Sequence, residues 1–326
     1  MSNKKSDQQR TLGLVKAGDI LPQIPQVKKH LPAVKPDGPI GLRLIEAADN
    51  MDPQTVLYQH TVFCQTGLPY RDPGDNVRSI ERVNGNIGLE VTAGKAWHPP
   101  RGQFVEVGIP FGTKPRLILA DINTQAIITQ SPEIDLEKTL TKFVKRMNLD
   151  PKGRNIKAVK EAMTRLCAAS IRLGLTHDGH GLTVQSQLMN SFDIWFPKDD
   201  RQRVLWPSKA TISGDYFQSL ILHGVPLDEA HYMTLSHSAL AMDIYAWLAQ
   251  RLHRVNSAQT LISWRQLHLQ FGWNYKHVRE FRRVFKIALK EVLAVYQVAR
   301  VEPDERGLIL RNSPPPVLKI QSRLAK

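Results

Sequence analysis

The segment 275–296 constrains the fold more than any other part of this 326-residue chain. Its apolar residues recur at intervals of three and four, which is the spacing of one helix face. At about 100° per residue, that face is narrow enough to form a single stripe. The stripe comprises Phe281, Phe285, Ala288, Leu289 and Val292. The pattern predicts a long amphipathic helix whose stripe is buried.

Another side of this helix gathers positive charge. On the same wheel, with Val278 at the origin, the basic residues fall between about 40° and 160°, whereas Glu280 and Glu291 lie at about 200° and 220°. A merely solvated face would mix its signs to gain pairs four residues apart. The unmixed arc predicts contact with nucleic acid. The predicted DNA-binding residues here are Lys276, Arg279, Arg282, Arg283, Lys286 and Lys290.

The elements around the long helix are in the order of a winged helix-turn-helix. A helix is predicted at 264–271, followed by a turn at Gly272, a second helix with Asn274 as its N-cap, and strands at 298–301 and 308–311. Further helices are predicted before them, at 215–223, 227–234 and 237–252. In this arrangement the helix after Asn274 would enter a major groove by its N-terminal end.

The preceding part of the chain shows a similar order. Predicted helices at 113–129, 136–147 and 155–170 precede strands at 171–176 and 182–196, and further strands are expected at 87–91 and 104–109. Arg154, Asn155 and Lys157 stand at the exposed start of the third helix. Arg and Asn can each read a base edge with two hydrogen bonds, and Lys can neutralise phosphate. These three residues are a second predicted DNA contact, although Glu161 shares their face.

The expected fold class is therefore α+β, with tandem winged-helix domains. Prolines among lysine pairs predict a flexible arm over residues 1–52, in which 41–49 could form a short docking helix. The first winged-helix-like domain is expected at 53–200 and the second at 201–313, with 197–207 as the connection because charge and proline cluster there. A basic tail follows at 314–326, where Pro314, Pro315 and Pro316 end regular structure.

Composition favours a polyanion partner and argues against several other classes. The net charge is +14, and residues 251–326 carry fifteen basic and five acidic side chains, a net of +10. No apolar run of membrane-spanning length is present, so we expect a cytoplasmic protein. Cys64 and Cys167 lack CxxC partners and are expected to be ordinary reduced thiols. Trp247 and Trp264 are expected to pack in the core. Trp273 is the one tryptophan considered for a DNA contact, although a structural role is favoured for it as well.

We find no anchor for catalysis in the sequence. The segment 108–114 lacks the spacing of a phosphate-binding loop, and no nucleophile elbow is present. His177 and His180 lie in a predicted turn and are not expected to form a metal site. His231 and His237 bracket a predicted helix junction and are expected to be capping or partly buried residues. We therefore expect a protein that is not an enzyme and needs no cofactor or metal.

Several strings of residues carry a resemblance to a known family. They are YQHTVFCQTGLPYR at 58–71, PFGTKPR at 110–116, GRN at 153–155, FDIWFP at 192–197, SHSA at 236–239 and DIYAWLAQRL at 243–252. The chain resembles the RepA-type plasmid replication initiators of Gram-negative bacteria over about residues 55–316. The resemblance implies a plasmid replication initiator that binds iteron repeats in double-stranded DNA at the origin and helps to melt an adjacent segment. It also implies recruitment of a host initiator and replicative helicase, a monomer–dimer equilibrium, and repression of its own gene.

Two alternatives remain open at this point. A transcriptional regulator with tandem winged helices would share every feature of the basic helix. A nuclease or primase would need clustered carboxylates for divalent metal, for which the adjacent Asp199 and Asp200 are the candidate pair.

Overall fold

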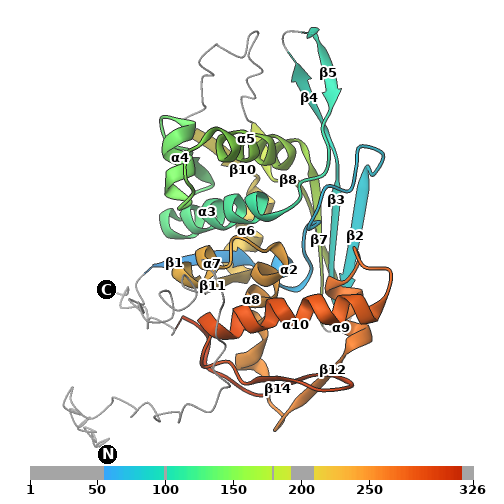
Figure 1. Ribbon diagram of the computed structural model, residues 1–326. Coiled ribbons are helices and arrows are strands. Elements are labelled where there is room, and N and C mark those ends of the chain that lie inside the picture. The colour runs from blue at the N-terminus through green and yellow to red at the C-terminus, as the bar shows by residue number, and fades with distance from the viewer. Residues whose placement is uncertain (1–54, 99–100, 178–179, 192–208, 318–326) are drawn as a thin grey trace, which may run out of the picture. The chain divides into compact units, whose positions relative to one another are not determined.

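A computed structural model describes residues 55–98, 101–177, 180–191 and 209–317 (Figure 1). The predicted arm at 1–52, the connection at 197–207 and the tail beyond 317 lie outside the described residues, as do Asp199 and Asp200. Helices and antiparallel strands alternate along the described chain, which confirms the α+β class. None of the described helices is both long and apolar enough to cross a membrane.

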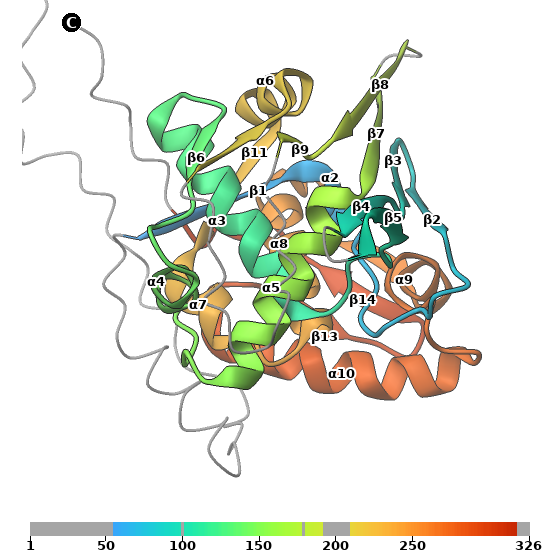
Figure 2. The ribbon, with the colours of Figure 1, turned by 90° about the horizontal axis from the view of Figure 1, so that it is seen from above.

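The first part of the chain combines three helices with a four-stranded sheet. The helices are α3 (Thr113–Thr129), α4 (Leu140–Arg146) and α5 (Gly153–Ala168). The sheet has the order β2-β3-β7-β8, from β2 (Ser79–Asn84), β3 (Ile87–Thr92), β7 (Ser170–His177) and β8 (His180–Gln187). Figure 2 shows α3 and α5 side by side, and the two helices pack against each other.

The predictions for this part hold with local shifts. Helix α3 has the expected bounds, and the strands at 87–91 and 171–176 are present. The helix expected at 136–147 starts later, at Leu140, because Thr139 accepts a hydrogen bond from Lys142 N and caps it. The expected strand at 104–109 is β5 (Gln103–Glu106), which pairs with the unpredicted β4 (Lys95–His98). The strand expected at 182–196 is divided into β8 and β9 (Met189–Ser191).

A three-stranded sheet, β6-β10-β9, contains strands from both sides of the undescribed residues 192–208. It pairs β10 (Lys209–Ile212) with β6 (Glu133–Asp135) and β9. Helix α6 (Gly214–His223) follows, with Ser213 as N-cap. The helix expected at 227–234 is wrong in its first part, because Val225 and Leu227 belong to β11 (Gly224–Asp228) and only α7 (Glu229–Thr234) is helical.

The last part of the chain has the order helix, strand, helix, helix, strand, strand. Its elements are α8 (Ala239–Arg251), a 3-10 turn η2 (Leu252–Arg254), β12 (Thr260–Ser263), α9 (Trp264–Phe271), α10 (Val278–Val295), β13 (Val301–Pro303) and β14 (Gly307–Leu310). The sheet order is β12-β14-β13, which places the last strand between the other two. Helix α9 has the predicted bounds, and β12 is an addition that the sequence did not predict.

The strand nearest the start of the described chain pairs with a strand from its later part. Strand β1 (Val56–His60) pairs antiparallel with β11, with Val56 opposite Asp228, and helix α2 (Thr61–Gln65) packs on α8. Most of the buried apolar side chains form one continuous cluster from Leu57 to Leu310, and the described residues belong to one compact unit. The predicted division between 53–200 and 201–313 falls in undescribed residues and stays a prediction.

His60 lies at the junction of β1 and α2 and is fully buried. Its Nδ1 accepts a hydrogen bond from the Val62 N–H at 3.2 Å, so Nε2 carries the ring proton and lies 3.0 Å from Ser219 Oγ. Burial, reinforced by the nearby His223, lowers the pKa of His60 to about 3. The neutral imidazole is therefore the form that fits this position.

This histidine makes stability depend on pH. Since the pKa is about 6.5 in the unfolded chain, its contribution is complete above that value and is lost as the pH falls toward 3. His60→Asn keeps a cap acceptor but does not titrate. In urea unfolding, we expect the free-energy advantage of the wild type over this variant to shrink by about 2 kcal/mol from about pH 7 to pH 5. A constant difference would show that His60 titrates normally in the folded protein.

Candidate nucleic-acid interface

The turn before α10 is set by a close approach of backbone groups. Gly272 N–H donates to His268 O at 2.7 Å, and a Cβ on Gly272 would lie 2.8 Å from the same oxygen. Gly272 has φ −98°, so lack of a side chain, rather than a left-handed conformation, is what the turn requires. The expected N-cap at Asn274 is wrong: the helix begins at Val278, and His277 is the N-cap without a side-chain hydrogen bond.

The apolar stripe of α10 is buried as predicted. Phe281, Phe285, Ala288, Leu289 and Val292 are each at most 4% exposed. The helix packs on α8 and α9, with the Phe285 ring 5.9 Å from Trp264 and 5.8 Å from Phe271 between centroids. Aromatic pairs at such distances add about 0.5–1.5 kcal/mol beyond the area that they bury. The stripe therefore fixes which side of α10 faces solvent.

The predicted basic residues of α10 divide into two groups. Lys276, Arg279, Arg283 and Lys290 are exposed. Arg282 and Lys286 are half-buried, and their charged groups lie over the Trp264 ring, 5.2 and 5.6 Å from its centroid. Such cation–π contacts hold the two side chains against the protein. The wheel could not distinguish the groups, because the aromatic neighbour comes from a different helix.

The acidic residues of α10 stay apart from the exposed cations. Glu291 Oε2 lies 3.2 Å from His237 Nε2, which links α10 to the turn before α8. Glu280 is exposed in the first turn of the helix, where an acidic residue is favourable for the helix dipole. The exposed face therefore presents Arg279, Arg283 and Lys290 with little neutralisation from its own helix.

Strands β13 and β14 form a hairpin next to α9. The turn between them is closed by Asp304 N–H, which donates to Gly307 O at 2.8 Å, and by Asp304 Oδ1, which accepts from Arg306 N–H at 2.9 Å. Trp264 Nε1 donates to Asp304 O at 3.0 Å, so the same tryptophan joins the hairpin and α10. Arg306 is exposed at this turn and Arg300 before it.

Helix α5 presents the second predicted contact at its first turn. Arg154 and Lys157 are exposed, whereas Asn155 is half-buried. Asn155 Nδ2 donates to Asp150 O at 2.8 Å and so holds the turn before the helix. Glu161, on the outward face, accepts from Arg165 Nη2 at 2.7 Å. The geometry leaves Arg154 and Lys157 as the side chains that are exposed to a ligand here.

The tryptophans and cysteines occupy structural positions. Trp247 and Trp264 are 1% and 5% exposed, which confirms their expected place in the core. Trp273 is half-buried, with the Arg82 guanidinium 4.4 Å above its ring. Cys64 and Cys167 are buried free thiols. In the part of the chain that the structure describes, no group of three His, Cys, Asp or Glu side chains is placed to hold a metal ion.

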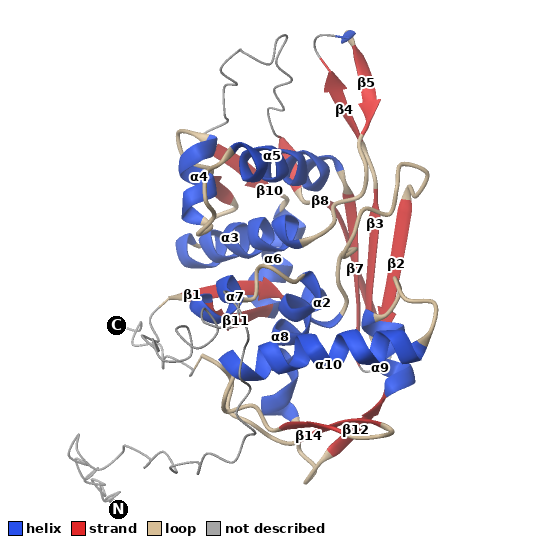
Figure 3. Ribbon diagram, in the orientation of Figure 1, coloured by secondary structure: helices blue, strands red, loops and turns tan. Residues whose placement is uncertain are grey.

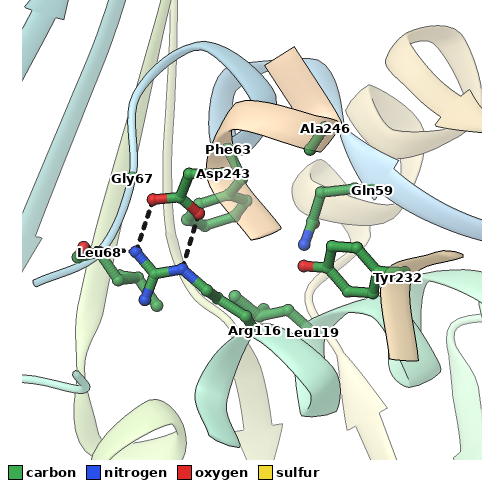
Figure 4. Close-up of a pocket in the computed structure, with 9 residues that line it drawn as sticks. All are labelled: Gln59, Phe63, Gly67, Leu68, Arg116, Leu119, Tyr232, Asp243 and Ala246. Atoms are coloured by element: carbon green, nitrogen blue, oxygen red, sulfur yellow. Dashed lines mark hydrogen bonds and ion pairs between the residues drawn. The ribbon is translucent and has the colours of Figure 1, made fainter. Parts of the chain in front are cut away.

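A buried ion pair connects α3 and α8, and the sequence did not predict it (Figure 4). Arg116 Nε and Nη2 donate to the two carboxylate oxygens of Asp243, each at 2.7 Å. The remaining guanidinium protons go to the carbonyl oxygens of Leu68, Pro69 and Gly112 at 2.6, 3.3 and 2.7 Å. All five donors of Arg116 are thus used.

This ion pair brings together three of the strings that carry the family resemblance. Gly67 and Leu68, Gly112 and Arg116, and Asp243 come from 58–71, 110–116 and 243–252. A Cβ on Gly67 would lie 2.5 Å from Asp243 Oδ2, so only glycine fits there. Burial raises the pKa of Asp243 and Arg116 opposes that shift. The space beside the pair is about 10 Å³, on the order of one water molecule, so the strings converge on a structural contact.

Comparisons with known proteins identify two similar solved structures and a family model that matches part of the chain. Two solved structures are similar to the chain at 8% sequence identity. A crystal structure of RctB domains 2-3 covers 76% of this chain and 94% of its own with a TM-score of 0.43, and one of selenomethionine derivatives of the same RctB domains covers 75% and 94% with a TM-score of 0.45. No curated protein matches. Residues 109–266 match the family model described as plasmid encoded RepA protein. This match contains Arg116, Asp243 and helix α5, so the resemblance seen in the sequence is confirmed over residues 109–266, the segment that is similar to plasmid-encoded RepA proteins.

Proposed function

We propose that this chain initiates plasmid replication by binding repeated duplex DNA sequences, iterons, at the plasmid origin through two winged-helix units. The match of residues 109–266 to the plasmid RepA family model supports the biological role. The order from α8 to β14, with β14 between β12 and β13, supports a winged helix in the second unit. The order α3, α4, α5 and the β7–β8 hairpin supports a related arrangement in the first.

In this proposal α10 lies in a major groove and its exposed cations contact DNA. Arg279 is nearest the N-terminal end of the helix, where base edges are reached, and can donate two hydrogen bonds to guanine. Arg283 and Lys290 continue along the same face and neutralise phosphates. Arg282 and Lys286 act mainly by holding α10 on Trp264. Arg300 and Arg306 place positive charge near the hairpin for a further phosphate contact.

Helix α5 makes the second contact, through Arg154 and Lys157. Two modest interfaces on one chain multiply each other's affinity when both can bind at once. Asn155 contributes indirectly, because its amide already closes the turn that orients Arg154. Binding of several copies to adjacent repeats would offset the few kcal/mol that bending or unwinding of a site costs. The proposed action therefore needs binding alone, with no covalent step, and recruits the host initiator and helicase to the melted segment.

The single observation that carries this proposal is the acid-free exposed face of α10, Arg279, Arg283 and Lys290, opposite a fully buried stripe. Footprinting on the DNA that flanks this gene tests it. We expect protected segments that recur at a fixed interval of about one to two helical turns. A single protected site, or none, would contradict repeat binding.

A transcriptional regulator would also give protected sites, so a second assay is needed. A replicon that carries the flanking DNA and this gene is expected to be maintained, and maintenance should fail when Arg279 and Arg283 are replaced by alanine. A replicon that persists without DNA binding by this chain would favour the regulator.

A further inference from the structure

The β4–β5 hairpin carries two large aromatic side chains in solvent. Trp97 and Phe104 are directly opposite in the strand register, with ring centroids 5.3 Å apart and ring planes at 70°. Trp97 is 49% exposed and Phe104 66%. Figure 3 shows β4 and β5 as a two-stranded arm that leaves the region of α5. An exposed cluster of this kind marks a binding surface more often than a lone apolar residue does.

The base of this hairpin is fixed to the rest of the protein. Val107 N–H donates to Gly94 O at 3.0 Å, and Arg78 donates to the carbonyl oxygens of Ala93 and Gly94 at 3.2 Å. A Cβ on Gly94 would overlap Ala168 O at 1.8 Å, so the chain passes directly over the end of α5. Ala96, Val107 and Ala168 form a small apolar cluster there. The aromatic pair is thus held at a defined place beyond the last turn of α5.

The charge of the hairpin favours an anionic partner. Its one acidic residue among the described positions, Glu106, forms ion pairs with Arg78 and Lys95. Arg101 is exposed near the tip. A polyanion can therefore approach the aromatic rings without meeting an unpaired carboxylate of the hairpin itself.

The area of the patch suits a nucleic-acid base better than a protein partner. At half to two-thirds exposure, two aromatic side chains of about 150–250 Å² each offer roughly 200–300 Å². A stable protein interface needs about 800 Å² on each partner. One or two stacked bases need no more than a ring face each.

We propose that Trp97 and Phe104 form a stacking site for unpaired DNA bases. The site rests on the proposed function, since an initiator that melts DNA produces a single strand close to the duplex that it holds. Helix α5 has 16 residues and is about 24 Å long, with Arg154 in its first turn and the base of the hairpin at its last residue, Ala168. A duplex bound at the first turn of α5 and a separated strand bound at the hairpin would therefore lie near opposite ends of the same helix.

Titration of full-length protein with fluorescein-labelled oligothymidine of about twenty nucleotides tests the stacking site. Trp97→Leu removes the ring and keeps an apolar side chain, whereas Trp97→Phe restores a ring. We expect Trp97→Leu to weaken single-strand binding by roughly tenfold, and Trp97→Phe to bind within about threefold of the wild type. Leu222→Ala, which removes a side chain that is 76% exposed on α6, is the matched control and should leave binding unchanged.

Salt and duplex DNA separate this site from the proposed duplex interface. Stacking does not release counterions, so the tenfold loss should persist as salt rises, and duplex affinity should stay unchanged in Trp97→Leu. If the wild type failed to bind duplex DNA, the proposed function would be contradicted. The stacking site would still be tested by whether single-strand affinity falls in Trp97→Leu. Equal single-strand affinity of Trp97→Leu and wild type would overturn the stacking site. An equal loss on duplex DNA, or a change of oligomeric state without a loss on single strands, would overturn it as well.

Discussion

Replacing Arg279, Arg283 and Lys290 together with alanine is expected to weaken duplex DNA binding by roughly five hundredfold at about 0.1 M salt. Each phosphate contact contributes about 0.9 to the slope of log affinity against log salt, so the lost Arg283 and Lys290 contacts flatten the slope by about 1.8 and weaken binding by roughly sixtyfold at this salt concentration. Loss of the Arg279 contact to guanine supplies the remaining factor of about eight, within the ~1–3 kcal/mol of such a contact. All three side chains are exposed and lie away from the buried stripe, so the fold should be retained. Fluorescence titration of a labelled duplex from the protected region, at four or more salt concentrations, measures both quantities.

A control with the same charge change keeps this result specific. Lys138, Lys142 and Lys209 are exposed residues outside both predicted interfaces, and their replacement by alanine lowers the net charge by the same amount. The control should change affinity several-fold at most and leave the slope nearly unchanged, because long-range effects are screened over about 10 Å at 0.1 M salt. An unaltered slope in the α10 variant would exclude this helix from the interface.

The second large effect is expected from the buried ion pair. Asp243→Ala leaves the Arg116 guanidinium, 3% exposed, without the carboxylate that pairs with it. Removing one member of a buried pair costs about 3–5 kcal/mol, a large part of the stability of an ordinary domain. We expect urea unfolding to show a loss of this size, or a chain that does not fold at ordinary temperature.

Two further variants identify the cause of that loss. Removing both charges, in Arg116→Met with Asp243→Leu, should recover part of the stability, because no uncompensated charge stays buried. Glu90→Ala breaks the more exposed ion pair with Arg172 and should cost less than about 1 kcal/mol. If Asp243→Ala cost no more than Glu90→Ala, the burial of the pair would be of no energetic consequence.

The sequence predicted elements best where local signals agree. Helices α3 and α9 have the predicted bounds: Gly112 stands directly before α3, and Gly272 stands directly after α9. The buried stripe of α10 followed from periodicity alone. The error at β11 has the opposite cause: Val225 and Leu227 fit a helix as well as a strand, and pairing with β1 decides between them.

The interface could be predicted only in part. Periodicity gave the direction of each α10 side chain, but Trp264 holds Arg282 and Lys286, and that contact depends on how α9 packs. Arg116 and Asp243 are 127 positions apart, so no local pattern relates them. Phe104 was predicted as an ordinary strand residue and Trp97 was assigned to no element, since sequence does not show which face of a hairpin stays uncovered.

The pairing of β1 with β11 has a consequence for synthesis of the protein on the ribosome. Val56 meets Asp228 only after about 170 further residues have been made, which takes roughly 10–30 s at bacterial rates. During that interval the hydrogen-bonding edge of β1 and the apolar side chains of α2 lack their final neighbours. The nascent chain is therefore open to chaperones, and to misassembly with other copies, until its second half emerges.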